Sequence, residues 1–269
     1  MLIDSHCHLD RLDLKPFEGD FDRFMARARE EGVGHMLCVG INLSTFERCA
    51  ELAARHPEEI SLSAGEHPND SKGQPLDVER LLEYGRRRQV VAIGETGLDY
   101  FRSEGELTWQ QERFRQHIQV AKTLNKPLIV HSRAAKEDTL RIWQEEGAME
   151  VGGVLHCFAE DWDMARRALD LNLYISFSGI VTFRNAQAIQ EAAQKVPEDR
   201  FLIETDSPYL APVPYRGKPN YPFYVRKVAE KIAELRGTTL ERVGETSRDN
   251  FYRLFPLALS EKTQELELQ

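Results

Sequence analysis

Two histidines lie two positions apart near the start of the chain, within Asp4-Ser5-His6-Cys7-His8. In an extended strand alternate side chains share a face, so Asp4, His6 and His8 are predicted to point one way and Cys7 the other. Two imidazoles on one face can hold a metal ion between them. Taken alone, however, this pattern is more often a histidine pair that makes ordinary hydrogen bonds in a loop.

Further potential ligands follow four other short apolar segments. They are Glu95 after 90–94, His131 after 127–130, His156 after 153–155, and Glu204 with Asp206 after 201–203. The carboxyl ends of parallel strands converge at one rim of a barrel, which is where barrel enzymes place their active sites. Four imidazoles and two or three carboxylates are too many for one tetrahedral ion and suit two ions that share a bridging carboxylate. The sequence therefore predicts a two-metal site.

The elements that must position these ligands alternate along the chain. The predicted strands are 2–6, 35–41, 60–64, 90–93, 127–131, 153–158, 173–177 and 201–204. The predicted helices are 21–31, 44–55, 76–88, 109–124, 136–146, 162–171, 186–195 and 224–236, with 239–255 as an additional helix. Such alternation is typical of βα units, and their number in 269 residues favours a closed (β/α)₈ TIM barrel. An open doubly wound sheet would carry a glycine-rich phosphate loop after its first strand, where this chain has Ser5-His6-Cys7-His8.

The composition is that of an ordinary globular domain, with 41% hydrophobic and 29% charged residues. We expect one barrel domain over 1–257 and a polar tail over 258–269. No apolar segment approaches the roughly 18 residues that a spanning helix needs, and we find no secretion signal. The four cysteines, Cys7, Cys38, Cys49 and Cys157, lack zinc-finger spacing, so we expect reduced thiols in a cytoplasmic protein. The net charge of −9 argues against a large basic surface for nucleic acid, but not against a nuclease that handles phosphates through metal ions.

Several motifs resemble those of the TatD family of metal-dependent hydrolases, and they occur in the family's order. They are Asp4-Ser5-His6-Cys7-His8-Leu9-Asp10, Gly65-Glu66-His67-Pro68, Gly94-Glu95-Thr96-Gly97-Leu98-Asp99-Tyr100, His131-Ser132-Arg133, His156-Cys157-Phe158 and Glu204-Thr205-Asp206-Ser207-Pro208-Tyr209. The resemblance covers about residues 1–257. It implies a barrel of the amidohydrolase-like type, two divalent ions and hydrolysis of DNA phosphodiester bonds, with the 3′–5′ exonuclease as the typical activity.

The resemblance also implies how the two ions are held. The implied ligands are His6, His8 and Asp206 for one ion, His131 and His156 for the other, and Glu95 as the bridge. Zn²⁺ suits histidine-rich ligation, whereas Mg²⁺ or Mn²⁺ suits nuclease chemistry. Many amidohydrolases bridge their metals with a carbamylated lysine, but here the fourth strand ends in Glu95 with no lysine nearby, so none is expected. Glu66 stands where the family has an apolar residue, and alternation turns it away from the pocket.

The chemistry of the carboxylates and of one further histidine at the rim predicts their roles in catalysis or in orienting ligands. Asp206 and Glu95 form the predicted catalytic pair, because Asp206 can bind a metal ion or accept a proton from the attacking water. Glu204 and Asp4 are expected to orient a ligand rather than bind an ion. His67 ends the third strand and is expected to contact a phosphate or protonate a leaving group, with an ordinary rim histidine as the alternative.

Two arginines are predicted to bind substrate. Arg133 follows His131 by two positions, so alternation turns its guanidinium into the pocket, where it suits a phosphate oxygen. Arg216 lies in 215–220 after the last strand, where barrel enzymes often bind phosphate. A solvated basic turn is an equal alternative for Arg216.

The leading hypothesis is a monomeric metal-dependent deoxyribonuclease, with DNA as substrate and RNA as a second option. A first alternative keeps the metal ions but cleaves an amide or an ester, including an ester on tRNA, because a barrel does not choose its substrate. A second alternative is a binding protein with a vestigial metal site. The complete ligand set argues against it, since a vestigial site should have lost a ligand.

Overall fold

Eight apolar segments form parallel strands, and neighbours in the sequence are neighbours in the sheet. The strands are β1 (Leu2–Cys7), β2 (Val33–Cys38), β3 (Ile60–Ala64), β4 (Val90–Asp99), β5 (Leu128–Arg133), β6 (Gly153–Leu155), β7 (Leu173–Phe177) and β8 (Phe201–Ile203). The first and last strands also meet, because Cys7 pairs with Ser207 and the Asp206 N–H donates to the His6 carbonyl over 2.9 Å. The predicted (β/α)₈ barrel is therefore confirmed in this computed structural model, which describes residues 1–70 and 73–259.

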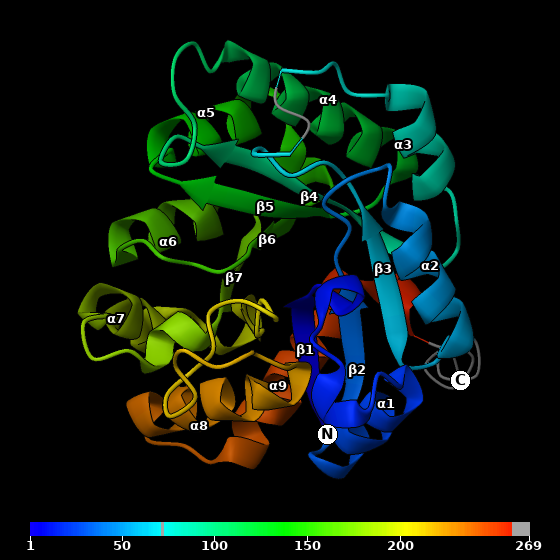
Figure 1. The fold of residues 1–269 in the computed structure, drawn as a ribbon. Helices are drawn as coiled ribbons and strands as arrows, with labels where there is room; N and C mark the ends of the chain where they lie inside the picture. The colour runs from blue at the N-terminus through cyan, green and yellow to red at the C-terminus, as the bar shows by residue number, and fades with distance from the viewer. Residues whose placement is uncertain (71–72, 260–269) are drawn as a thin grey trace, which may run out of the picture.

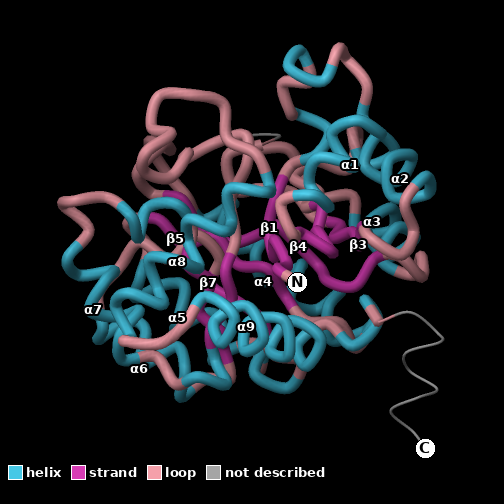
Figure 2. The backbone as a smooth tube through the Cα atoms, turned by 90° about the horizontal axis from the view of Figure 1, so that it is seen from below, coloured by secondary structure: helices cyan, strands magenta, loops and turns pink. Residues whose placement is uncertain are grey.

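Helices surround the strands on the outside of the barrel (Figures 1 and 2). They are α1 (Phe21–Glu30), α2 (Phe46–Arg55), α3 (Val78–Gly85), α4 (Thr108–Leu124), α5 (Lys136–Glu145), α6 (Trp162–Asp170), α7 (Gln187–Lys195), α8 (Val225–Arg236) and α9 (Leu240–Leu254). In α1, the apolar side chains of Phe21, Phe24 and Ala28 recur at helical spacing and are buried, so one face packs on the barrel. Asp20 begins this helix by accepting a hydrogen bond from the Asp22 N–H.

The apolar core has two layers. The larger layer lies between the strands and the helices. The second fills the barrel itself with side chains such as Ile3, Leu37 and Ile129. Phe251 of α9 and Phe255, just beyond that helix, belong to this inner layer and are fully buried. The additional helix predicted at the C-terminus therefore closes the end of the barrel opposite the carboxyl ends of the strands.

Strand β4 is longer than predicted and extends past Ile93 to Asp99. Two glycines in this segment resemble strand breakers in the sequence. In the structure Gly97 pairs with His131 of β5 at φ +128°, where an added Cβ would lie 2.1 Å from the His131 carbonyl oxygen. Because Gly97 has no Cβ, the backbones of β4 and β5 can approach closely here, and β4 continues beyond Glu95.

The other strand boundaries differ less from the prediction. Strand β2 ends at Cys38 and β6 at Leu155, three residues earlier than predicted in each case. Of the predicted tail, Ala258 belongs to the short helix Pro256–Ala258, whereas 260–269 lie outside the described residues. Within the described chain, no helix is both long enough and apolar enough to cross a membrane.

Candidate metal centre

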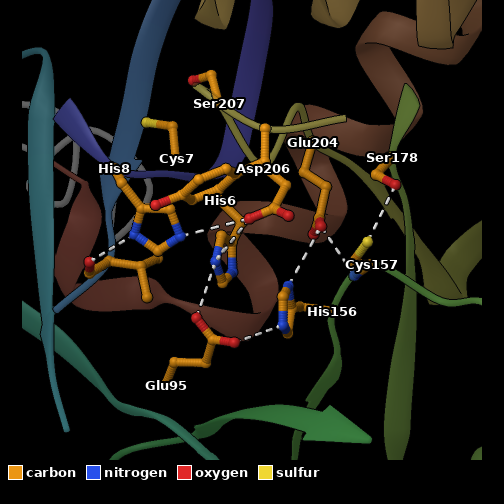
Figure 3. A network of polar contacts seen from close by, with 12 residues as sticks. His6, Cys7, His8, Glu95, His156, Cys157, Ser178, Glu204, Asp206 and Ser207 are labelled. Carbon is orange, nitrogen blue, oxygen red and sulfur yellow. Dashed lines mark hydrogen bonds and ion pairs between the residues drawn. The ribbon is translucent and has the colours of Figure 1, made fainter. Parts of the chain in front are cut away.

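The ring nitrogens of three predicted ligands surround the carboxylate of Glu95 at the carboxyl end of the barrel, and two of these ligands, His6 and His156, can be seen beside Glu95 in Figure 3. Oε2 of Glu95 lies 3.3 Å from Nε2 of His6. Oε1 of Glu95 lies 3.2 Å from Nδ1 of His131 and 2.8 Å from Nε2 of His156. Glu95 is therefore shared by side chains from β1, β5 and the residue after β6, as a bridging ligand must be.

Asp206 forms the second half of the cluster. Its Oδ1 lies 3.3 Å from Nε2 of His8 and 3.7 Å from Nε2 of His6. Two sets of donor atoms, each within 4.8 Å of one another, result from this packing: His6, His8 and Glu95, and His6, His156 and Asp206. The structure thus brings together all six of the residues predicted to ligate metal.

Hydrogen bonds fix the orientation of the candidate ligand histidines. Nδ1 of His8 donates to the Val39 carbonyl over 3.1 Å, since a carbonyl oxygen can only accept. Nε2 of His131 faces Asp99 at 3.1 Å, and Nδ1 of His156 faces Glu204 at 3.4 Å. In each ring the outward nitrogen carries a proton, so the other nitrogen is the one that faces the cluster, where it would bind a cation once it has lost any proton of its own.

The donor set suits cations. Both ring nitrogens of His6 are buried, and neither has a hydrogen-bond partner among the described residues. Burial alone raises the pKa of Glu95, but the neighbouring His156 and the hydrogen bonds from His131 and His156 lower it by more, to well below its usual range. Burial likewise raises the pKa of Asp206, and His8 and His6 lower it by more. Two ionised carboxylates beside inward-facing imidazole nitrogens form a donor set that suits a divalent ion.

His67 also reaches the cluster, but with the opposite orientation. Its Nδ1 accepts a hydrogen bond from the Asn69 N–H over 3.0 Å. Burial lowers the pKa of His67 to about 4, so near neutral pH the ring holds a single proton, on Nε2. That N–H lies 3.3 Å from Oε1 of Glu95. Although His67, Glu95 and His131 form a third set of closely spaced donors, His67 is placed to donate a hydrogen bond rather than to ligate.

Asp99 is a positioning residue that the sequence analysis did not identify. Its carboxylate accepts from Nε2 of His131, from the Asn69 amide over 2.7 Å, and from the N–H groups of Phe101 and Arg102. Burial raises the pKa of Asp99, but the hydrogen bond from His131 and those from its other donors leave it well below its usual value. Alternation along β4 was the available signal, since Asp99 lies four positions after Glu95 on the same face.

Glu204 and Asp4 both lie behind the cluster, but only Glu204 faces the ring of a candidate ligand histidine. Oε1 of Glu204 accepts from the Cys157 N–H over 2.8 Å and faces His156. Asp4 accepts two hydrogen bonds from Thr205, from its N–H over 2.9 Å and from its hydroxyl over 2.5 Å. It therefore holds the segment between Glu204 and Asp206 rather than a histidine ring.

A cavity of about 500 Å³ opens above the cluster. Arg133 lines it, as alternation along β5 predicts, and so do Arg11 and Arg102, which the sequence analysis did not single out. Arg216 does not line this cavity. Its exposed guanidinium lies 4.0 Å from the ring centroid of Phe183.

Glu66, the residue that departs from the family pattern, does not line the cavity either. Its Oε2 lies 3.9 Å from Nη1 of Arg113, on α4. Alternation correctly predicts that this side chain points away from the pocket.

Comparison with known proteins gives consistent matches along nearly the whole chain. The family model described as TatD related DNase matches residues 3–256. An Escherichia coli (strain K12) protein named "Uncharacterized metal-dependent hydrolase YcfH" is 48% identical over 96% of this chain and 97% of its own length. The Bacillus subtilis (strain 168) protein "Uncharacterized metal-dependent hydrolase YabD" is 41% identical over 95% of this chain and 99% of its own length.

A solved structure shares the architecture. The crystal structure of YJJV, a TatD homologue from Escherichia coli K12, superposes with a TM-score of 0.86 at 28% identity, over 95% of this chain and 98% of that one. The match of family model and relatives extends across the barrel and includes every residue of the cluster. The chain belongs to the TatD family of metal-dependent hydrolases.

Proposed function

We propose that this hydrolase is a deoxyribonuclease that removes nucleotides from the 3′ end of a DNA strand. The observation that supports the proposal is the lining of the cavity. Three arginines, Arg11, Arg102 and Arg133, face the space directly above the metal-ligand cluster in a protein whose net charge is −9. Guanidinium groups bind phosphate oxygens through paired, charge-assisted hydrogen bonds. Their presence in an otherwise acidic protein supports a substrate that carries several phosphates.

Two aromatic side chains favour an unpaired end over a duplex. Phe101 is 67% exposed, and the Arg133 guanidinium lies 4.1 Å from its ring centroid. Tyr209 is 46% exposed and lines the cavity, with its hydroxyl 3.4 Å from Nη1 of Arg11. Each ring thus lies beside a proposed phosphate-binding arginine, and unstacked bases bind to such rings.

In the proposed reaction, water attacks phosphorus, the new P–O bond forms, and the ester oxygen leaves with a proton. Bound divalent ions would polarise the phosphate and lower the pKa of the water. Asp206 is ionised and faces the cavity, so its carboxylate can accept the proton of the water. Arg133 donates to a non-bridging oxygen. The N–H of His67 can donate to the leaving oxygen or to a neighbouring phosphate.

The proposed enzyme is complete within one chain. All six candidate ligands and the arginines come from a single barrel, so we propose that a monomer is sufficient. The four free cysteines fit a reducing compartment, which we propose is the cytoplasm.

A second candidate function keeps the centre and changes the bond to an amide or an ester, including an aminoacyl ester on tRNA. The same arginines would serve the RNA part of such a substrate. A small neutral amide carries no phosphate for the three guanidinium groups to bind, so the cavity lining argues against that option.

The test is turnover of end-labelled DNA by protein that has been stripped with a chelator and refilled with Zn²⁺, Mg²⁺ or Mn²⁺. Parallel reactions should contain single-stranded DNA with a free or a blocked 3′ end, duplex DNA, single-stranded RNA, a simple amide and an aminoacyl-tRNA. We expect single-nucleotide products from the free 3′ end and no turnover of the blocked strand. Turnover of the amide or the aminoacyl ester without release of nucleotides would contradict the proposal.

A further inference from the structure

A second group of potential metal ligands lies outside the catalytic cavity. Sγ of Cys38, Sγ of Cys49 and a carboxylate oxygen of Asp10 all lie within 4.8 Å of one another. Cys38 ends β2, Cys49 is on α2, and Asp10 is in the short helix Leu9–Arg11 that follows His8. The three donors therefore converge from separate elements.

This group lies on the outer side of the barrel wall. Both cysteines belong to the apolar layer between strands and helices, whereas the catalytic ligands face the cavity. Cys7 shares the outer layer, and its thiol points away from Glu95 (Figure 3). That thiol donates to the Leu37 carbonyl over 3.4 Å, so Cys7 already has a partner. The two cysteines thus lie in the outer layer, whereas the catalytic cluster lies at the cavity.

Burial makes ordinary solvation of these groups difficult. Cys38 is completely buried, Cys49 is 2% exposed, and the Asp10 side chain is 10% exposed. Nε of Arg11 lies 3.9 Å from Asp10, at the limit of an ion pair. The adjacent Cys38 thiol and burial raise the pKa of Cys49, and Asp10 raises it further. Without a cation the Cys49 thiol keeps its proton, whereas a bound cation would stabilise its thiolate and offset the charge of the Asp10 carboxylate.

We propose that Asp10, Cys38 and Cys49 bind a thiophilic divalent cation of the Zn²⁺ class at a site separate from the catalytic centre. Binding replaces the two thiol protons, which pass to solvent, and needs no oxidant. Sulfur ligands select such ions, whereas Mg²⁺ and Mn²⁺ prefer oxygen. The bound ion would tie the segment after His8 to β2 and α2. The catalytic centre and this site would therefore differ in the metal that they prefer.

Cobalt provides the test, because thiolate ligands give Co²⁺ an intense near-ultraviolet charge-transfer band that imidazole and carboxylate ligands do not give. Chelator-stripped, reduced full-length protein is titrated with Co²⁺ without air. We expect the band to appear in the wild type and to disappear when Zn²⁺ is added. It should be lost in Cys49→Ala and weakened in Asp10→Asn.

The matched control is Cys157→Ala, because Cys157 is the cysteine that lines the catalytic cavity. We expect this variant to keep the band. Absence of the band in the wild type, its survival in Cys49→Ala, or its loss in Cys157→Ala would each overturn the proposal.

A second measurement on the wild type covers the case in which Cys49→Ala does not fold. Zn²⁺ should protect Cys38 and Cys49 from a thiol-alkylating reagent, as read by peptide mass spectrometry, and a chelator should remove the protection. Equal alkylation of both cysteines with and without Zn²⁺ would contradict the site. So would their conversion to a disulfide in the presence of Zn²⁺.

Discussion

The Glu95 carboxylate lies among four imidazole rings. Its negative charge attracts cations, and no neutral side chain can supply that charge. We expect Glu95→Gln to abolish turnover and to lower the affinity of both catalytic ions, because the amide keeps the shape and loses the charge that two cations share. Metal stoichiometry and kcat on labelled DNA are the measurements. Glu66→Gln is the control, since it also removes a buried carboxylate but lies outside the cavity. Retention of one ion at wild-type affinity in Glu95→Gln would show that Glu95 binds a single ion.

Asp99 determines which nitrogen of His131 faces the cluster. Its carboxylate accepts hydrogen bonds from four donors, and an asparagine amide at this position would turn a donor toward some of them. Substitution of a residue that orients a metal ligand in this way typically lowers metal affinity by about 10- to 100-fold. We expect Asp99→Asn to lower cation affinity by that factor, measured by competition with a chromophoric chelator. Unchanged affinity would mean that His131 keeps its orientation without Asp99.

Arg133 is expected to act on substrate and not on metal. Loss of a charge-assisted hydrogen bond costs about 1.5–3 kcal/mol, which is about a tenfold to hundredfold fall in kcat/KM for Arg133→Ala. Metal content should stay at the wild-type value. Arg216→Ala is the matched control, because each arginine covers a phenylalanine ring but only Arg133 lines the cavity. Equal losses in both variants would place the phosphate contact outside the cavity or implicate the 215–220 turn.

The ligand residues could be predicted from sequence because they follow apolar strands directly. Their supporting contacts could not be predicted in the same way. Alternation placed Asp4 with His6 and His8, yet the pairing of β1 with β2 shifts register between Asp4 and Cys7. In the structure Asp4 contacts Thr205 instead of a histidine ring. Arg11 and Arg102 were missed because Arg11 ends the single-turn helix Leu9–Arg11 and Arg102 lies in a loop, and neither segment has a periodicity that indicates the direction of a side chain.

At the scale of elements, α9 supplies the ring that fills the base of the barrel. Phe251 is completely buried within the inner core layer. We expect Phe251→Ala to lower the free energy of unfolding by about 3–5 kcal/mol, because it removes apolar contacts and leaves a cavity. Urea denaturation measures this loss. Leu257→Ala, at a side chain 47% exposed, is the control and should change stability little.

The sequence predicted the order of the elements well, because strand and helix periodicities differ. The predicted end of β4 was wrong, because the strand continues past residue 93 to Asp99. Gly94 and Gly97 indicate a turn by composition, but only the pairing with β5 shows that they extend the strand. That pairing joins residues that are distant in the sequence, and local patterns contain no information about it.

At the scale of the whole molecule, His35 links stability to pH at the end of the barrel far from the metal centre. Burial lowers the pKa of His35 to about 4, and its ring hydrogen bonds to the Glu58 carbonyl and the Ser61 hydroxyl. The unfolded chain takes up a proton below about pH 6.5, which the folded ring does not do until about pH 4. Stability is therefore complete above pH 6.5 and falls by up to about 3 kcal/mol as the pH drops to about 4.

The variant that checks this is His35→Gln. Its free energy of unfolding, measured in urea at pH 8 and at pH 5, should depend less on pH than that of the wild type. An identical pH dependence in the two proteins would mean that His35 does not contribute.

The closed base of the barrel also determines by which route substrate can enter and product can leave. Phe251 and Phe255 seal the interior, so the mouth lined by Arg11 and Arg133 is the route for both arrival and departure. A DNA strand, the proposed substrate, could not be threaded through the barrel, and a cleaved fragment would have to leave along the path that the next substrate needs. We therefore expect the fragment and the substrate to exclude one another, so that inhibition by product is competitive.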